Sequence, residues 1–142
     1  MEIDDFFGIV YKLDSVEGGD RYCDYMGIGI GKQGGIYNKH QFIMLKPSCC
    51  GFDYNLMEQK GCNRYQNSYR TRQNYRELTL HNGICRSSLE IVGNRIIHDQ
   101  KGRRHIVTVR EFSEERMRTT ITVDSAVTLV KHYVKVARKT VM

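Results

Sequence analysis

The last third of the chain has the pattern that most restricts how it can fold. In residues 116–123, odd positions are mainly apolar and even positions are polar. A period of two is typical of a strand with one buried face. The polar pair at 124–125 predicts a hairpin turn into the β-branched run 126–136, and the charged turn 113–115 connects an earlier strand at 106–112. We therefore expect three consecutive antiparallel strands at this end of the chain.

The predicted inner face of this meander carries three polar side chains among apolar ones: Arg110, Lys131 and Tyr133. Burying a cation costs free energy unless an anion compensates it. These three residues are therefore candidates for binding an anionic ligand. The alternative is structural: Lys131 extends its amine to solvent at a strand end, and Arg110 pairs with a local glutamate. The pattern alone does not separate the two interpretations.

The rest of the chain also favours short strands separated by turns. Strands are predicted at 6–13, 40–46, 52–58, 78–81, 84–92 and 95–100. Turn signals such as Asn82–Gly83 and Gly93–Asn94 recur about every ten residues. This spacing predicts an all-β, up-and-down antiparallel barrel or sandwich, and the length predicts a single domain over residues 1–142.

The best helical candidate in the pattern is Asp20–Met26, which two glycines precede. The glycine-rich stretch 27–35 that follows lacks the lysine–hydroxyl pair of a phosphate-binding loop. A tight turn between short helices is the better interpretation of that stretch.

Composition narrows the possible partners and the compartment. The formal net charge of +6 favours acidic partners, which include nucleic acid, anionic lipid and acidic protein, although a solvated basic exterior is also compatible with it. No apolar run approaches the ~20 residues of a membrane span, and the acidic N-terminus does not resemble a secretion signal. The five cysteines form no CxxC pair, and the adjacent Cys49 and Cys50 are expected to stay free thiols. Reduced cysteines predict a cytoplasmic protein.

A second candidate surface is the segment 63–76, in which arginines and tyrosines alternate irregularly. Such a mixture can bind single-stranded nucleic acid by stacking and by phosphate contacts. The alternative function is therefore a basic module that binds RNA or an acidic partner. The structural interpretation, which we prefer, is a polar strand whose arginines face solvent and whose tyrosines are half-buried, because no RNA-binding motif accompanies the run.

Catalysis has little support in the sequence. The five histidines fall in different predicted strands or turns, and no serine or cysteine nucleophile motif is present. No cysteine or histidine spacing indicates a zinc site. We therefore expect no catalytic residues, no metal and no cofactor, and a binding protein instead of an enzyme.

Four short motifs resemble those of the cytoplasmic fatty-acid-binding proteins, the intracellular lipid-binding family. Residues 7–13 (FGIVYKL) are similar to the opening F-x-G-x-[WY]-K-L strand, and residues 22–29 (YCDYMGIG) are similar to the first portal helix and the glycines after it. Residues 109–112 (VREF) resemble the V-R-E-[FL] strand, and residues 131–133 (KHY) resemble the terminal R-x-Y. The segment 36–75 departs from the family pattern.

This resemblance implies a ten-stranded up-and-down β-barrel with a short helix-turn-helix lid between the first two strands. It implies a monomeric intracellular carrier that holds a long-chain fatty acid, or a related carboxylate such as a retinoid, and that binds no nucleic acid. The family's carboxylate-binding residues correspond to Arg110, Lys131 and Tyr133. Lys131 stands where the family has an arginine, so it offers a point charge instead of a planar fork. We also expect Lys32 and other surface cations to promote transient contact with anionic membranes.

Overall fold

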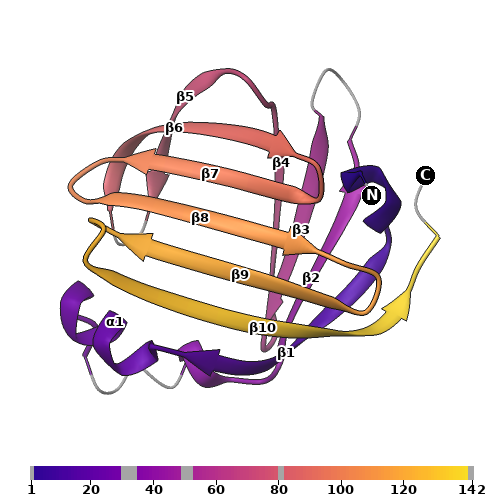
Figure 1. The fold of residues 1–142 in the computed structure, drawn as a ribbon, viewed down its shortest axis with the longest axis horizontal. Coiled ribbons are helices and arrows are strands. Elements are labelled where there is room, and N and C mark those ends of the chain that lie inside the picture. Colours follow the sequence, from indigo (N-terminus) through magenta and orange to yellow (C-terminus); the bar gives the residue numbers. More distant parts are fainter. Residues whose placement is uncertain (1, 30–34, 49–52, 80–81, 141–142) are drawn as a thin grey trace.

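The computed structural model describes residues 2–29, 35–48, 53–79 and 82–140. Ten antiparallel strands form one strongly curved sheet, and short helical elements lie near the start of the chain (Figure 1). The strands are β1 (Ile9–Glu17), β2 (Gln41–Pro47), β3 (Tyr54–Lys60), β4 (Asn63–Tyr69), β5 (Asn74–Thr79), β6 (Gly83–Val92), β7 (Arg95–Lys101), β8 (His105–Phe112), β9 (Arg116–Val123) and β10 (Val127–Arg138). The helical elements are the 3-10 helix η1 (Ile3–Phe6) and the α-helix α1 (Gly19–Met26).

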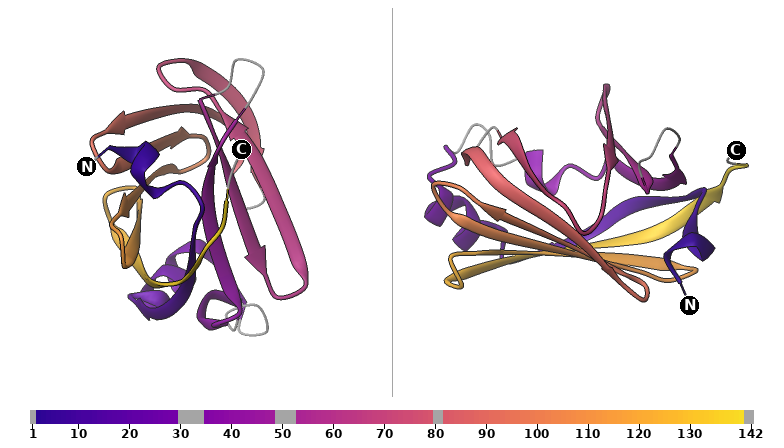
Figure 2. Two further views of the ribbon diagram at one scale, coloured as in Figure 1. Left: turned by 90° about the vertical axis from the view of Figure 1, so that its right-hand side faces the viewer. Right: turned by 90° about the horizontal axis from the view of Figure 1, so that it is seen from above.

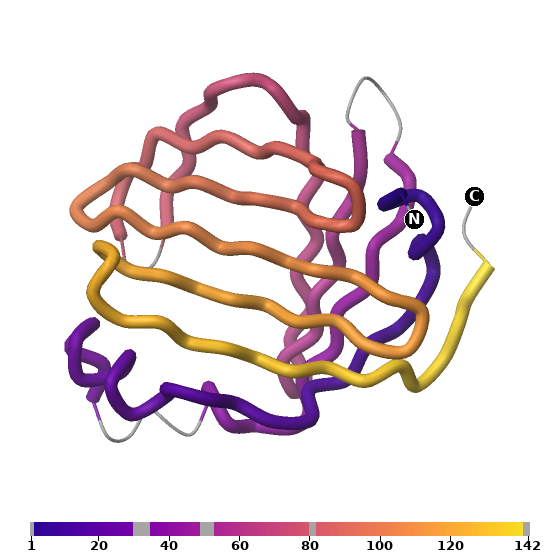
Figure 3. Tube along the Cα trace, in the orientation of Figure 1, coloured from indigo at the N-terminus to yellow at the C-terminus, as the bar shows by residue number. Residues whose placement is uncertain are grey.

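The strands follow each other in space nearly as they do in sequence, as the chain trace shows (Figure 3). Two connections depart from this order: β1 pairs with β10 as well as with β2, and the consecutive strands β4 and β5 form the two ends of the hydrogen-bonded order. Strands β1 to β4 and strands β6 to β9 therefore curl into two layers that cross each other (Figure 2). The predicted up-and-down barrel is confirmed.

The predicted lid is also where the sequence places it. The α1 helix lies between β1 and β2, and residues 35–37 are helical as well. Residues 30–34, which include Lys32, and the pair Cys49–Cys50 lie outside the described residues. Within the described ranges, no helix has the length and the apolar character needed to span a bilayer.

The hairpin between β9 and β10 has the predicted form. Val123 pairs with Val127, and Asp124 and Ser125 between them both adopt positive φ angles, of 52° and 55°. Two successive left-handed residues are typical of the tight turn that fits the twist of a hairpin, and aspartate tolerates this conformation well.

The first strand differs from the prediction at its start. A strand was expected from Phe6, but β1 begins at Ile9 and Phe6 belongs to η1. Glu2 and Asp5 form a capping box that stabilises this helical turn, and Gly8, with φ at 87°, redirects the chain into β1. Phe6 then stacks on Phe112, with ring centroids 6.1 Å apart, and helps to close one end of the barrel.

Two apolar clusters lie at opposite ends of the strands. The larger one includes Phe6 of η1, Phe112 at the end of β8 and Met117 at the start of β9. The smaller one, Ile106, Val123 and Val127, lies at the other end, beneath α1. Tyr22 and Met26 of α1 pack on this smaller cluster, which explains the helical spacing of apolar residues in the sequence.

A group of polar contacts around Asp124 also holds α1 to the barrel. The hydroxyl of Tyr25 donates to Asp124 Oδ2 over 2.9 Å, and the Arg104 guanidinium lies 4.7 Å from the Tyr25 ring centroid. Arg104 Nη1 also lies 3.3 Å from Asp124 Oδ2, and the backbone N–H of His105 donates to Asp124 Oδ1 over 2.8 Å. Asp124 therefore links α1 to both adjacent turns.

Replacing Asp124 with asparagine is expected to loosen α1. Asparagine also tolerates the left-handed backbone, so the change removes the charge and leaves the turn intact. Hydrogen exchange of the α1 amides should become several-fold faster than in the wild-type protein. Tyr25→Phe, which removes a single hydrogen bond, should give a smaller effect. Wild-type exchange rates in both variants would show that apolar packing alone holds the helix.

Candidate functional site

The three residues predicted as a site lie on one face of the sheet. Lys131 of β10 is directly opposite Thr119 of β9, and Thr119 is directly opposite Arg110 of β8. Residues opposite each other in adjacent strands project on the same side of the sheet. Lys131, Thr119 and Arg110 therefore form a row across it, and we call Lys131 and Arg110 the cationic row. Tyr133, two residues beyond Lys131 on β10, projects on this side too and is only 7% exposed. The sequence prediction of their shared face is confirmed.

Arg110 is buried with part of its donor capacity unused. Its side chain is 13% exposed, and its Nη2 donates a long hydrogen bond of 3.4 Å to Glu58 Oε1. The Nε of Arg110 is buried and has no partner. Burial lowers the pKa of Arg110, but the Glu58 carboxylate and nearby tyrosines more than offset this, so the pKa ends above its ordinary value. Arg110 is thus a permanent cation with a free donor.

Lys131 has a different environment. Its Nζ donates to Gln41 Oε1 over 3.1 Å, and no described carboxylate forms an ion pair with it. Burial, together with the positive charges of Lys60 and Arg110, lowers the pKa of Lys131 to about 8, although Glu58 acts in the opposite direction. The ammonium group is therefore close to losing its proton at neutral pH.

Gln41 is fixed in the orientation that Lys131 needs. The amide nitrogen of Gln41 donates to the backbone carbonyls of residues 35, 36 and 38, at 2.8, 3.2 and 2.8 Å. The side-chain oxygen is then left to accept from Lys131. Because residues 35–37 are helical, Gln41 connects the helical segment before β2 to the cationic row.

The row carries more positive than negative charge when Lys131 is protonated. Arg110 and Lys131 supply two cations, while Glu58 is the carboxylate that pairs with Arg110. Glu58 also lies 3.9 Å from Lys60, but that lysine is 52% exposed and is solvated. A ligand carboxylate would compensate the remaining charge of the row.

Two buried tyrosine hydroxyls face the same region. Tyr54 is 2% exposed and its hydroxyl has no partner, while burial raises the pKa of Tyr133 well above its usual value. Both hydroxyls therefore stay protonated and can donate. The charge of Arg110 lowers the pKa of each against the effect of burial, which is consistent with a shared interior. Tyr54, Tyr133 and Arg110 Nε together suit a group rich in acceptors, such as a carboxylate.

A second polar group, centred on Glu77 of β5, lies farther along the barrel. Its Oε1 accepts from Ser87 Oγ at 2.8 Å and from the Gln100 side-chain amide, and lies 3.0 Å from His98 Nε2. Burial raises the pKa of Glu77, but these hydrogen bonds more than compensate and lower it to about 2. His98 Nε2 is also 3.1 Å from the Tyr75 hydroxyl. This carboxylate is already satisfied, so the group is structural.

Aromatic rings connect the two polar groups. Tyr54 lies 5.5 Å from Tyr69 between ring centroids, Tyr69 lies 5.9 Å from His98, and His98 lies 6.4 Å from Tyr75. A cavity of about 540 Å³ opens beside this chain of rings, between β4 and β5, and Tyr69, Tyr75 and Glu77 line it. Its volume is within the range of about 300–1,000 Å³ that is usual for small-molecule sites.

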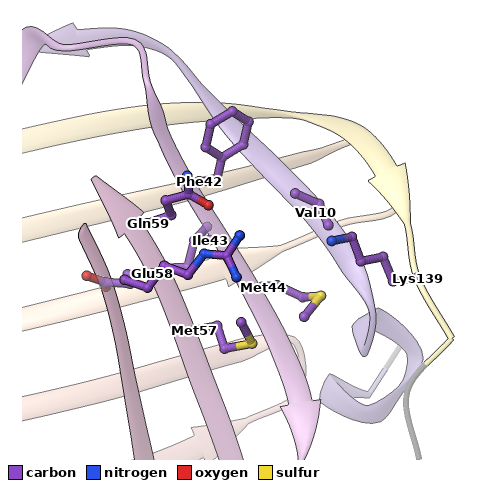
Figure 4. A pocket seen from close by; sticks show the side chains of 9 residues that line it. Val10, Phe42, Ile43, Met44, Met57, Glu58, Gln59 and Lys139 are labelled. Atoms are coloured by element: carbon purple, nitrogen blue, oxygen red, sulfur yellow. The ribbon is translucent and has the colours of Figure 1, made fainter. Parts of the chain in front are cut away.

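A smaller hollow of about 80 Å³ lies over β1, β2 and β3 (Figure 4). Val10, Met44 and Met57, at positions paired across these three strands, are among the residues that line it. At ~30 Å³ for each water molecule, this volume is too small for a long acyl chain. The cavity beside Tyr69 and Tyr75 has room for more of such a ligand.

The second candidate surface, the Arg/Tyr segment 63–76, gains no support as a nucleic-acid site in the described part of the chain. The Arg/Tyr segment forms β4 and the start of β5, and its arginines face solvent, while Tyr69 and Tyr75 turn inward against His98. Among the described residues, no cluster of His, Cys, Asp and Glu is placed to hold a metal ion.

Sequence reasoning missed the residues that complete the site: Gln41, Tyr54 and Glu58. They lie in the segment where the family resemblance fails. One signal was available, because Gln41 alternates with Ile43 and Leu45, which are 4% and 0% exposed, and therefore faces the interior. The pairing of Glu58 with Arg110 left no comparable signal.

The structure is therefore a ten-stranded β-barrel with a row of cations on its inner face. No protein-family model matches the chain, and no curated protein matches its sequence. The solved structures do match: the chain is similar to a fatty-acid-binding protein from brain tissue of Drosophila melanogaster, with 26% identity and a TM-score of 0.75 over 91% of this chain and 98% of that one.

Two further structures agree with this comparison. Lipid binding protein 8 of Caenorhabditis elegans has a TM-score of 0.80 and 14% identity over 96% of this chain and 99% of that one. A Schistosoma mansoni fatty acid binding protein in complex with arachidonic acid has a TM-score of 0.76 and 17% identity over 96% of this chain and all of that one. The chain thus has the fold of the fatty-acid-binding proteins, as its short motifs predicted.

Proposed function

We propose that this protein is a carrier that binds a long-chain fatty acid, or a similar hydrophobic carboxylate, inside its barrel. The observation that carries the proposal is the buried row of Arg110 and Lys131, whose positive charge Glu58 only partly compensates. The unpaired donors of Arg110 and Tyr54 add to it. The structural neighbours that bind fatty acids support the same ligand class.

The acyl chain supplies the driving force in this proposal. Each buried methylene contributes ~0.8 kcal/mol, and immobilising the ligand offsets much of the sum, so we expect an affinity near or tighter than the micromolar range. The cationic row fixes the orientation of the head group. The protein acts without chemistry on this ligand, as one domain over residues 1–142, and works as a monomer in the cytoplasm.

The direct test is binding by delipidated protein. A fluorescent fatty-acid analogue should bind at about one molecule per chain, and oleate should displace it. Mass spectrometry of lipid extracted from the native protein would identify the natural ligand. Folded protein that binds none of several fatty acids or retinoids would rule the proposal out.

Affinity for oleate should depend on pH through Lys131. A bound carboxylate favours the protonated amine, whose pKa in the free protein is lowered to about 8. Binding should therefore weaken as the pH rises from 7 to 9.5, because proton uptake then accompanies it. Lys131→Met should bind more weakly at pH 7 and lose most of this pH dependence. A pH profile that is the same in both proteins would place the head group away from Lys131.

Delivery would involve transient contact with anionic membranes, because the chain carries a net charge of +6. Transfer of a fluorescent fatty acid to vesicles should accelerate when acidic lipid is added and slow when salt is added. Rates that respond to neither would indicate release into water.

A further inference from the structure

Lys131 is a buried amine that can lose its proton, which Arg110 in the same row cannot do. An arginine cannot lose its proton in a protein, whereas a buried lysine can become a neutral amine with a free lone pair. The Lys131 Nζ makes one hydrogen bond, to the amide oxygen of Gln41, and has no carboxylate partner among the described residues. An amide oxygen carries no full charge, so it stabilises the ammonium form of Lys131 less than a carboxylate partner would.

The charges around Lys131 also favour the neutral amine. Arg110 projects on the same face two strands away, and Lys60 acts on Lys131 from β3, while Glu58 is the one carboxylate that acts in the opposite direction and is engaged by Arg110. Burial and these charges together lower the pKa of Lys131 to about 8, so its neutral amine forms more readily than that of an exposed lysine. A desolvated lysine of this kind is a nucleophile towards carbonyl groups.

We propose that Lys131 forms a reversible imine with a long-chain aliphatic aldehyde held in the barrel, so that the site takes lipid aldehydes as well as carboxylates. This inference rests on the proposed lipid-binding function, because the acyl chain must occupy the same interior. It adds a ligand class that is held by a covalent bond.

The step is balanced without an oxidant or a reductant. The Nζ lone pair attacks the aldehyde carbon, a C–N bond forms, and the carbonyl electron pair moves to oxygen. A proton passes from nitrogen to that oxygen to give a carbinolamine, which then loses water as the C=N bond forms. Tyr133 and Arg110, on the same face as Lys131, supply donors for the oxygen while it carries charge. Hydrolysis reverses the step and releases the aldehyde.

A matched control lies on the same strand. Lys135 of β10 is also a lysine with limited exposure, at 25%, but its Nζ pairs with Glu114 over 3.2 Å and with Glu115 over 3.9 Å. Lys135 thus has two carboxylate partners, which Lys131 lacks among the described residues, and it is not in the cationic row. It should therefore react much less than Lys131.

The experiment uses the full chain, tetradecanal as the probe, and cyanoborohydride to reduce any imine to a stable amine. Intact-mass spectrometry should show one adduct per chain, and peptide mapping should place it on Lys131. Lys131→Arg should reduce labelling at least tenfold, whereas Lys135→Arg should label like the wild-type protein. Excess oleate should suppress labelling, and propanal, which lacks a long chain, should not select Lys131.

Two measurements separate this inference from the proposed function. Binding of a fluorescent fatty acid is measured on the same preparations, and thermal unfolding verifies that each variant is folded. Fatty-acid binding with no tetradecanal adduct on Lys131 of the wild-type protein would overturn the imine and leave the carrier intact. Adducts spread evenly over several lysines would also overturn it. If the folded wild-type protein neither binds the fluorescent fatty acid nor forms the tetradecanal adduct, both proposals are overturned.

Discussion

Replacing Arg110 with glutamine should weaken the binding of oleate by about tenfold to a hundredfold and leave the binding of oleyl alcohol nearly unchanged. A hydrogen bond to a charged group contributes about 1.5–3 kcal/mol, and every 1.4 kcal/mol is about a factor of ten in affinity. The alcohol forms no charge-assisted bond, so it loses little. Displacement of a fluorescent fatty acid by each ligand would measure the difference.

Glu58 requires its own control, because Arg110→Gln removes its buried partner and leaves it only the exposed Lys60. Glu58→Gln frees the guanidinium of Arg110 from its internal competitor and should tighten oleate binding. The double variant removes both charges and separates the loss of the ligand contact from damage to the fold. If acid and alcohol lose affinity equally in Arg110→Gln and in the double variant, the head group binds elsewhere.

Replacing Glu77 with glutamine should reduce the free energy of unfolding at pH 7 by about 3 kcal/mol. Folding lowers the pKa of this carboxyl from 4.5 to about 2, and each pKa unit corresponds to about 1.4 kcal/mol. The side chain is only 22% exposed, so solvent screens its hydrogen bonds little. Glutamine keeps the shape and the acceptor oxygen but loses the charge that strengthens the three contacts.

The effect of Glu77→Gln should depend on pH with a definite sign. A carboxyl whose pKa is lowered by folding stabilises the protein above its unfolded pKa, and this contribution disappears as the pH falls from about 4.5 to 2. Urea unfolding at pH 7 and at pH 3 should thus show the gap between variant and wild type shrink to less than half. Ser87→Ala, which removes a single donor, should cost only about 1 kcal/mol at pH 7. An equal gap at both pH values would contradict the explanation.

The sequence was sufficient for the parts of this structure that depend on local pattern. Alternation between residues 116 and 123 predicted which side chains of β9 are buried, and the polar pair Asp124–Ser125 predicted the turn. The same period of two placed Arg110, Lys131 and Tyr133 on one side of the sheet. Each of these inferences needs only neighbours along the chain or in the next strand.

The remainder of the site depends on contacts across the barrel, which no local pattern encodes. Glu58 meets Arg110 from a strand 52 residues away in sequence, and Gln41 meets Lys131 over a separation of 90 residues. Phe6 shows the same limit on a smaller scale, because its sequence context favours a strand while its packing against Phe112 places it in η1. Such pairings follow from how β2 and β3 curl over β8 and β10.

The pairing of β1 with β10 has a consequence for how the chain acquires its fold. Ile9 pairs with Arg138, so this part of the sheet joins residues separated by well over a hundred positions. Because closing so long a loop costs entropy before the contacts form, we expect folding to take milliseconds to seconds. During synthesis β1 can pair only with β2, and its other edge keeps unsatisfied N–H and C=O groups until β10 has left the ribosome. An open edge of this kind invites pairing with other chains. We therefore expect a chain truncated before β10 to aggregate, and a chain that includes β10 to need protection by chaperones until this strand has emerged.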